Sequence, residues 1–226
     1  MKKLIYTFLI WLMFIGVGFP ATYYMRSDGT AANKEAATGC GAASTAMNIT
    51  VHNAEDFAGG DIINLCDDGA ENYGADGSIL TPPDSGSSGS VITYQKATGD
   101  TPTFLNPYNN AIFVNGKSYL VFDGLTFSGS CTGCDEYPAT YMSKHQIRLY
   151  GVTTPVSHIE IKNCTFGNGP QSAINLWREC DYNYIHDNTF NAHWPLDTYP
   201  GPWGNQDTIY MNDSDYNKII DNLRTR

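Results

Sequence analysis

The chain has 226 residues, of which 23 are acidic and 13 are Lys or Arg, giving a formal net charge of −10. This balance argues against a nucleic-acid-binding protein and against binding to anionic membrane surfaces. Charged residues make up only 16% of the chain, which suits an extracellular β protein more than a charged cytosolic domain.

Residues 1–21 are predicted to be a secretory signal peptide. Lys2 and Lys3 precede an apolar run from Leu4 to Val17, and small residues follow. The run of about 14 residues is short for a membrane span. Cleavage after Gly18 or after Ala21 would leave 11 basic residues against 23 acidic ones, a net charge of −12. We therefore expect a secreted or cell-surface protein with no membrane span after cleavage.

Residues 22–60 predict an N-terminal strand and a cap. The sequence TYYM from Thr22 to Met25 is typical of a strand, and the segment from Ser44 to Phe57 can include a short helix. A cap is expected because the bare end of a stacked fold exposes apolar side chains and unpaired strand edges.

Residues 61–226 predict the coils of a solenoid in a single domain. After strands in GGDIINL and VITYQ, four segments repeat a strand, a short turn, a second strand and a polar turn. They begin at Ala111, Gln146, Ser172 and Asp207. A repeat of two strands with no helix between them favours an all-β parallel β-helix. The competing interpretation, an antiparallel sandwich, needs hairpin turns, and Asn115-Gly116 is the one candidate.

Aligning the repeats places equivalent side chains in files. One file holds Phe127, Phe166 and Phe190, the second holds Phe122, Ile161, Ile185 and Ile219, and the third holds Leu125, Cys164, Asn188 and Asn222. Coils stacked about 4.8 Å apart would turn these files into ladders, with the Asn188 amide bonded to that of Asn222. Glu160, Tyr184 and Lys218 should face outward by alternation. The chain stops at Arg226, within the closing turn of the fourth repeat, so we expect coils to be missing from the C-terminus.

The sequences of three repeat segments are also similar to those of a known family. NGKSYLVFDGLTF, HIEIKNCTF and YNYIHDNTF resemble coils of the right-handed parallel β-helix superfamily, the pectate-lyase-like proteins. The resemblance is strong from Ala111 onward and weaker between Tyr23 and Asn106. It implies a right-handed parallel β-helix, and it leaves the activity open because this scaffold carries lyases, hydrolases, adhesins and non-catalytic surface proteins. The Asn-Thr-Asp, Asp-Asp and Gly-His-Gly motifs of the polygalacturonase-like branch are absent, as is the Trp-Ile-Asp-His motif of the pectate-lyase branch.

Six cysteines in an exported chain permit 15 disulfide connectivities. A bond between Cys40 and Cys66 would join the cap to the first coil. The CTGC motif that begins at Cys131 could close a loop. Cys164 occupies an inward position, where a buried free thiol and a bond to Cys180 are equally compatible with the pattern.

The length of the repeat varies at one place in the coil. Phe127 and Phe166 are 39 residues apart, whereas Phe166 and Phe190 are 24 apart. The additional residues, Ser128 to Lys144 and Asn191 to Gln206, follow the same strand two coils apart. Insertions on one face of a solenoid commonly form the binding face, so both loops could border one groove.

Aromatic and polar residues in these loops are candidate contacts for a polysaccharide. They are Trp194, Trp203, Tyr199, Tyr141 and His193. Flat aromatic faces stack on the C–H faces of sugar rings, while neighbouring polar groups bond the hydroxyls. The alternative is that Trp194 and Trp203 only close the loop over the flank of the coils.

Acidic residues in and after the second loop are candidate calcium ligands. They are Asp197, Asp207, Asp213 and Asp215. In lyases of the superfamily, calcium bridges protein and uronate carboxylates and acidifies the C5 proton, which a Lys or Arg removes in a β-elimination. The resemblance thus implies Arg178, Lys144 and His145 as candidate catalytic residues, with Arg148 as a further basic group. The alternative, which the sequence favours, is that Asp213 and Asp215 are solvated turn residues.

We predict a secreted β-helix protein that binds polysaccharide and is non-catalytic or of unknown activity. The alternative is a calcium-assisted polysaccharide lyase that acts by β-elimination on uronate-containing glycans, with calcium as its candidate cofactor.

Overall fold

The computed structural model describes residues 20–67, 72–105, 110–128, 145–167, 172–191 and 208–225. Every pairing between the named strands in these ranges is parallel. The signal-peptide prediction falls almost entirely on residues 1–19, which lie outside the described part of the chain. No helix in the described part is long and apolar enough to cross a bilayer.

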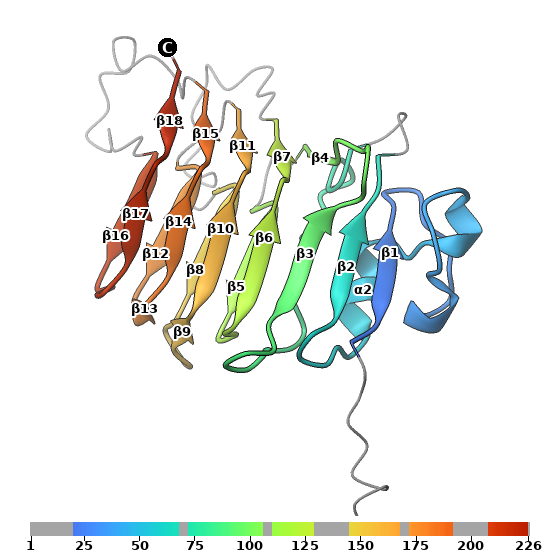
Figure 1. Cartoon of the computed structure of the whole chain (residues 1–226), viewed down its shortest axis with the longest axis horizontal. Coiled ribbons are helices and arrows are strands. Elements are labelled where there is room, and N and C mark those ends of the chain that lie inside the picture. The colour runs from blue at the N-terminus through green and yellow to red at the C-terminus, as the bar shows by residue number, and fades with distance from the viewer. Residues whose placement is uncertain are drawn as a thin grey trace, which may run out of the picture.

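The strands form three main parallel sheets that run along one axis (Figure 1). Sheet A holds β1 (Thr22–Met25), β2 (Ile62–Leu65), β3 (Ile92–Lys96), β6 (Leu120–Asp123), β10 (Ile159–Lys162), β14 (Tyr184–His186) and β17 (Lys218–Ile220), in that order. Sheet B holds β4 (Thr103–Phe104), β7 (Thr126–Phe127), β11 (Thr165–Phe166), β15 (Thr189–Phe190) and β18 (Leu223–Arg224). Sheet C holds β5 (Ile112–Asn115), β8 (Ile147–Tyr150), β12 (Ile174–Trp177) and β16 (Ile209–Asn212), and β9 (Val156–Ser157) pairs with β13 (Cys180–Asp181).

Each complete coil visits the sheets in the order C, A, B, as β8, β10 and β11 illustrate. The predicted parallel β-helix is therefore confirmed. The competing hairpin at Asn115-Gly116 is absent, because β5 pairs in parallel with β8 of the next coil. Strand β1 pairs with β2 in register from Thr22 to Met25, so the first strand belongs to the coil stack as well as to its N-terminal end.

The turn between sheets A and B repeats one backbone conformation. Gly124, Asn163, Asp187 and Asp221 occupy the same place in four coils, and their φ angles are 71°, 52°, 53° and 53°. Gly, Asn and Asp are the residues that adopt this left-handed region at least cost. The sequence therefore specifies a sharp corner at each of these positions.

The predicted ladders fill the interior. Phe127, Phe166 and Phe190 stack with ring centroids 4.9 Å apart, and Phe104 extends the file by one coil, with 5.2 Å between its ring and that of Phe127. The last coil continues this file with Arg224. Apolar side chains of this coil, namely Met211, Ile219 and Leu223, are exposed.

Asparagine ladders close two corners. The Asn188 side chain donates to Oδ1 of Asn222 over 3.0 Å, as predicted, and to the Ile161 carbonyl over 2.9 Å. A second ladder, which was not predicted from the sequence, joins Asn183 to Asn217 over 3.0 Å at the corner before sheet A. Cys164 and Cys180 are both free and buried, so the open question of their pairing is resolved in favour of free thiols.

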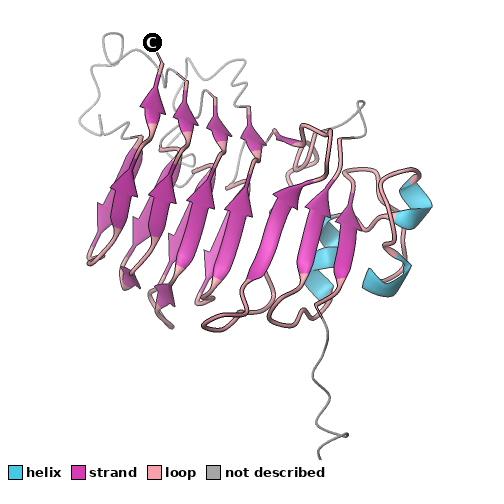
Figure 2. Cartoon of the chain, in the orientation of Figure 1, coloured by secondary structure: helices cyan, strands magenta, loops and turns pink. Residues whose placement is uncertain are grey.

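The helices gather at the N-terminal end of the stack (Figure 2). They are η1 (Lys34–Ala36), η2 (Ala43–Thr45) and α2 (Ile49–Ala54), and the last confirms the predicted short helix. Asn48 caps α2 by accepting a hydrogen bond from the Val51 backbone over 2.9 Å. The disulfide between Cys40 and Cys66 joins this cap to β2, as expected from the sequence.

Candidate functional site

The outward face of sheet C carries a distinctive set of side chains. Alternation along the four strands turns Ile112, Ile147 and Ile174 into the core. Register then aligns two outward files across the coils. The first file holds Phe113, Arg148, Asn175 and Tyr210, and the second holds Asn115, Tyr150, Trp177 and Asn212.

Four aromatic residues in these files form what we call the aromatic platform: Phe113, Tyr150, Trp177 and Tyr210. The rings of Phe113 and Tyr150 lie 5.7 Å apart, and those of Trp177 and Tyr210 lie 6.2 Å apart. All four side chains are partly exposed. A face of a solenoid that presents aromatic rings on four successive coils is suited to a long ligand that runs along the axis.

Arg148 lies among these rings. Its guanidinium carbon is 4.9 Å from the centre of the Tyr150 ring and 6.0 Å from that of Trp177, which are cation–π distances. Burial lowers the pKa of Arg148, although an arginine stays charged at physiological pH. Nε of Arg148 and Oδ1 of Asn175 are buried and have no hydrogen-bond partner among the described residues.

One border of this face is a strained turn directly after β12. Arg178 and Glu179 are both exposed and have φ angles of 56° and 41°, a region that bulky residues rarely occupy. The turn is held by backbone bonds to the next coil, since Arg178 donates to the Asn212 carbonyl over 2.7 Å and Glu179 to the Asp213 carbonyl over 2.8 Å. Such outliers persist where the surrounding structure fixes them, and they cluster at functional sites.

The opposite border lies just before β8, at His145. Its Nδ1 is 2.6 Å from the Ser172 hydroxyl, and its backbone N–H donates to Oδ1 of Asn110 over 3.1 Å. Burial, helped by the positive charge of Arg148, lowers the pKa of His145 to about 3. His145 is therefore neutral at physiological pH and is a weak proton acceptor there.

The structure does not bring the described candidate catalytic residues together. His145 precedes the strands of sheet C and Arg178 follows them, and a strand of four residues spans about 13 Å. Asp213 and Asp215 are exposed in the turn after β16. This turn lies next to the Arg178 turn, because the backbone N–H of Glu179 donates to the Asp213 carbonyl. The remaining candidates lie outside the described residues: Lys144, Tyr141, His193, Trp194, Asp197, Tyr199, Trp203 and Asp207.

The strands on either side of the two long insertions show which sheets the insertions connect. One runs from β7 to β8 and the other from β15 to β16, so both connect sheet B to sheet C, two coils apart. Both insertions therefore lead directly into strands that carry the outward face of sheet C.

No group of three carboxylates or histidines suited to a metal ion occurs in the part of the chain that the structure describes. The one candidate group there is Cys40, Cys66 and Asp100, and its two sulfurs form the disulfide. Asp213 and Asp215 by themselves cannot supply the six to eight oxygens that calcium requires.

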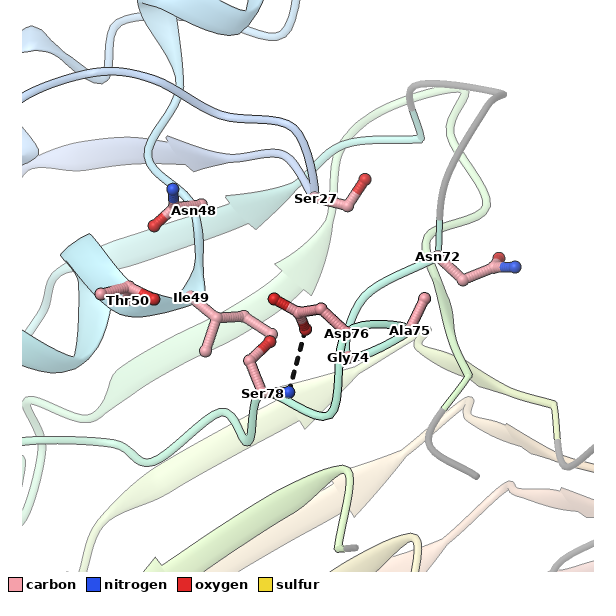
Figure 3. A pocket seen from close by; sticks show the side chains of 9 residues that line it. All are labelled: Ser27, Asn48, Ile49, Thr50, Asn72, Gly74, Ala75, Asp76 and Ser78. Atoms are coloured by element: carbon pink, nitrogen blue, oxygen red, sulfur yellow. Dashed lines mark hydrogen bonds between the residues drawn. The ribbon is translucent and has the colours of Figure 1, made fainter. Parts of the chain in front are cut away.

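A small polar pocket of about 110 Å³ lies in the N-terminal part of the molecule, between the first turn of α2 and residues 72–78 (Figure 3). Asp76 is its charged member, and its carboxylate accepts a hydrogen bond from the Ser78 backbone over 2.9 Å. Hydrogen bonds from Ser78 lower the pKa of Asp76. The pocket shares no residue with the outward face of sheet C and was not identified from the sequence.

A family model described as the right-handed beta helix region matches residues 88–224. The chain belongs to this family. The matched residues include β3 to β18, and the N-terminal cap precedes them.

Among solved structures, this right-handed β-helix is similar to the crystal structure of pectate lyase Pel9A, with 13% sequence identity and a TM-score of 0.40. The likeness covers 83% of this chain and 57% of the lyase, so the chain spans less than two thirds of that protein's length. No curated protein matches the chain.

The aromatic platform of this right-handed β-helix was not predicted from the sequence. Each of its members lies one or three residues after the first Ile of a sheet C strand, which is an outward position by alternation. The sequence therefore contains the pattern, in Phe113, Tyr150, Trp177 and Tyr210. Aligned between coils, these outward positions form a file of aromatic residues just as the inward positions form files of Phe and Ile.

Proposed function

We propose that the outward face of sheet C binds a polysaccharide chain, and that the protein is a non-catalytic glycan-binding β-helix. The observation that carries this proposal is the aromatic platform, because partly exposed rings with a guanidinium among them suit the apolar faces and hydroxyls of sugars. A linear glycan fits the geometry, since the rings repeat from coil to coil along one axis.

Residues of the two insertions would extend the same surface. Trp194, Trp203, Tyr199, Tyr141 and His193 belong to segments that lead into β8 and β16, whose outward side chains are part of the platform or flank it. We propose that they contribute further stacking and hydrogen-bonding contacts to the glycan. The predicted export of the protein would place this surface where polysaccharides occur.

Replacing Trp177 with Ala should weaken glycan binding by about 0.5–1.5 kcal/mol, which is the usual contribution of an aromatic contact. Calorimetric titration or affinity electrophoresis against a polysaccharide panel would measure the change. The matched control is Tyr184→Ala, which removes a partly exposed ring from the outward face of sheet A and should leave binding unchanged. Equal losses in both variants, or no loss with Trp177→Ala, would contradict the assignment of the site to sheet C.

A second candidate function is a calcium-assisted polysaccharide lyase, and the strained Arg178 turn favours it. In this proposal Arg178 would have to be in its neutral form to take the C5 proton of the uronate, and Asp213 and Asp215 would join Asp197 and Asp207 as ligands of a calcium ion that binds the uronate carboxylate. The lyase needs a basic group held at the substrate, and an exposed arginine kept in an unfavourable backbone conformation meets that need in part.

Arg178→Gly separates a functional role of this turn from a structural one. Glycine occupies the left-handed region without strain, so the variant should be as stable as the parent or more stable by about 1 kcal/mol. If Arg178 acts on the glycan, turnover or binding is lost at the same time. The control is Asp221→Gly, which changes another left-handed residue at the corner between β17 and β18. This variant should leave both turnover and glycan binding unchanged. Unfolding by urea and ultraviolet absorbance of unsaturated products on a uronate panel would report the two quantities. Retention of full activity in Arg178→Gly would remove Arg178 from the mechanism.

A further inference from the structure

One buried side chain on the outward face of sheet C stands apart from its counterparts. Asn175 is 2% exposed, and its Oδ1 has no hydrogen-bond partner among the described residues. The other buried asparagines, Asn183 and Asn188, are fully engaged in the corner ladders. A buried polar atom without a partner is uncommon in a native structure and calls for an explanation.

The residue paired with Asn175 on the neighbouring strand also has a buried polar atom with no hydrogen-bond partner among the described residues. Arg148 lies directly opposite Asn175 on the neighbouring strand β8, and its Nε is also buried with no hydrogen-bond partner in the described ranges. Both side chains leave the sheet on the outward side, on strands about 4.8 Å apart. The two paired positions thus hold one unsatisfied acceptor and one unsatisfied N–H donor, and both atoms are buried beneath this face.

The chemistry of this pair defines the group that would complete it. A hydroxyl both donates and accepts, so a single hydroxyl can donate to Oδ1 of Asn175 and accept from Nε of Arg148. A carboxylate has only acceptors and would set its oxygens against the amide oxygen of Asn175. A metal ion would suit the amide oxygen but would be repelled by the guanidinium.

We propose that Arg148 and Asn175 form a subsite for a hydroxyl of a neutral sugar, so that the glycan bound by sheet C is neutral at this position. The inference rests on the proposed function of this face and names its ligand class. It opposes the uronate-lyase alternative at this position.

The surroundings of the pair support a sugar as the source of the hydroxyl. The guanidinium of Arg148 lies over the rings of Tyr150 and Trp177, which holds it in place beside the platform. A pyranose ring that stacks on the platform carries hydroxyls at its edge, and one of these is the hydroxyl that we propose to enter between Arg148 and Asn175. The site therefore combines an apolar surface with an oriented donor and acceptor, as sugar-binding sites require.

The test compares neutral and acidic oligosaccharides of equal length by calorimetric titration. Cellohexaose, mannohexaose and xylohexaose are the neutral probes, and hexagalacturonate is the acidic one. We expect at least one neutral probe to bind about tenfold more tightly than hexagalacturonate, because a site with a buried unpaired acceptor discriminates strongly against a second acceptor.

Asn175→Leu is the informative variant. It removes the unsatisfied oxygen with little change in volume, so the unfolding temperature should stay the same or rise, while affinity for the neutral probe falls about tenfold. The matched control is Asn183→Leu, which breaks a satisfied ladder and should lower the unfolding temperature. Arg148→Met tests the donor in the same way as Asn175→Leu tests the acceptor.

The outcomes distinguish the two levels of the proposal. If hexagalacturonate binds more tightly than every neutral probe, the subsite inference is wrong and glycan binding by sheet C stands. If Asn175→Leu binds the neutral probe as well as the parent does, the two atoms hold only a buried water, and the inference is again wrong. If the parent binds none of the four probes, the proposed function fails and the inference falls with it.

Discussion

Phe166→Asp is expected to prevent the coils from folding. Phe166 is fully buried, and its ring stacks between those of Phe127 and Phe190 at 4.9 Å on either side. The substitution places a carboxylate in this apolar stack with no partner, at a cost of several kcal/mol in the free energy of unfolding. Because domains are stable by only about 5–15 kcal/mol, most of the folded population should be lost. Circular dichroism and urea unfolding would measure the effect.

Two control variants separate the effect of a buried charge from the effects of losing the ring and of adding a charge nearby. Phe166→Leu keeps the position apolar and should cost roughly 1–3 kcal/mol as a large-to-small change in the core, leaving the β signal intact. Thr165→Asp places the same charge on the neighbouring side chain of β11, which is only partly buried, and should have a much smaller effect. A Phe166→Asp variant with native circular dichroism and an unchanged unfolding midpoint would mean that the Phe file does not lie in the core.

The coil stack could be predicted from the sequence because the repeats end alike. Phe127, Phe166 and Phe190 mark the same place in successive coils, and counting back from them brings Ile161 over Ile185 and Asn188 over Asn222. Phe104 joins the first of these files in the structure, but it was not aligned with the later coils. Asn183 and Asn217 form a ladder as good as the predicted one, yet in a sequence they resemble ordinary polar turn residues.

The aromatic platform was not predicted from the sequence, for a physical reason. The Trp and Tyr residues of the insertions are dense in the sequence, whereas the platform is spread over four strands with one aromatic residue in each. Whether Asn175 finds a partner depends on which side chains of the neighbouring coils reach it, and that is tertiary information. The left-handed backbone of Arg178 is likewise imposed by bonds to the following coil and leaves no mark on its own residue type.

His52 in the cap should contribute strongly to the loss of stability at mildly acidic pH, alongside His145, whose pKa is also lowered by burial. His52 lies on α2 and is fully buried, with Nε2 3.1 Å from the Tyr94 hydroxyl and Nδ1 3.0 Å from Oδ1 of Asn53. Its ring stacks on Phe57 at 5.1 Å. Burial lowers the pKa of His52 from the ordinary 6.5 to about 4, despite hydrogen bonding to Asn53 and the negative charge of Asp84, which act in the opposite direction.

The sign of the effect follows from which state takes up the proton. Above pH 6.5 neither the folded nor the unfolded state binds a proton at His52, so this residue adds no pH dependence there. Between pH 6.5 and about 4 the unfolded chain binds the proton and the folded chain does not. The free energy of unfolding therefore falls as the pH is lowered through this window, by roughly 3 kcal/mol in total.

Urea unfolding at pH 7 and pH 4 would measure this loss, and His52→Gln isolates the part due to the imidazole. Glutamine keeps a polar side chain that can bond Tyr94 but does not titrate, so the loss of stability between pH 7 and pH 4 should be smaller in the variant by about 3 kcal/mol. Carboxylates and His145, whose pKa is also lowered by burial, titrate in both proteins and cancel in the comparison. An equal loss of stability on acidification in parent and variant would contradict the assignment. Since the disulfide between Cys40 and Cys66 keeps the cap attached to β2, acid should loosen the packing of α2 against Tyr94 without releasing the segment from the coils.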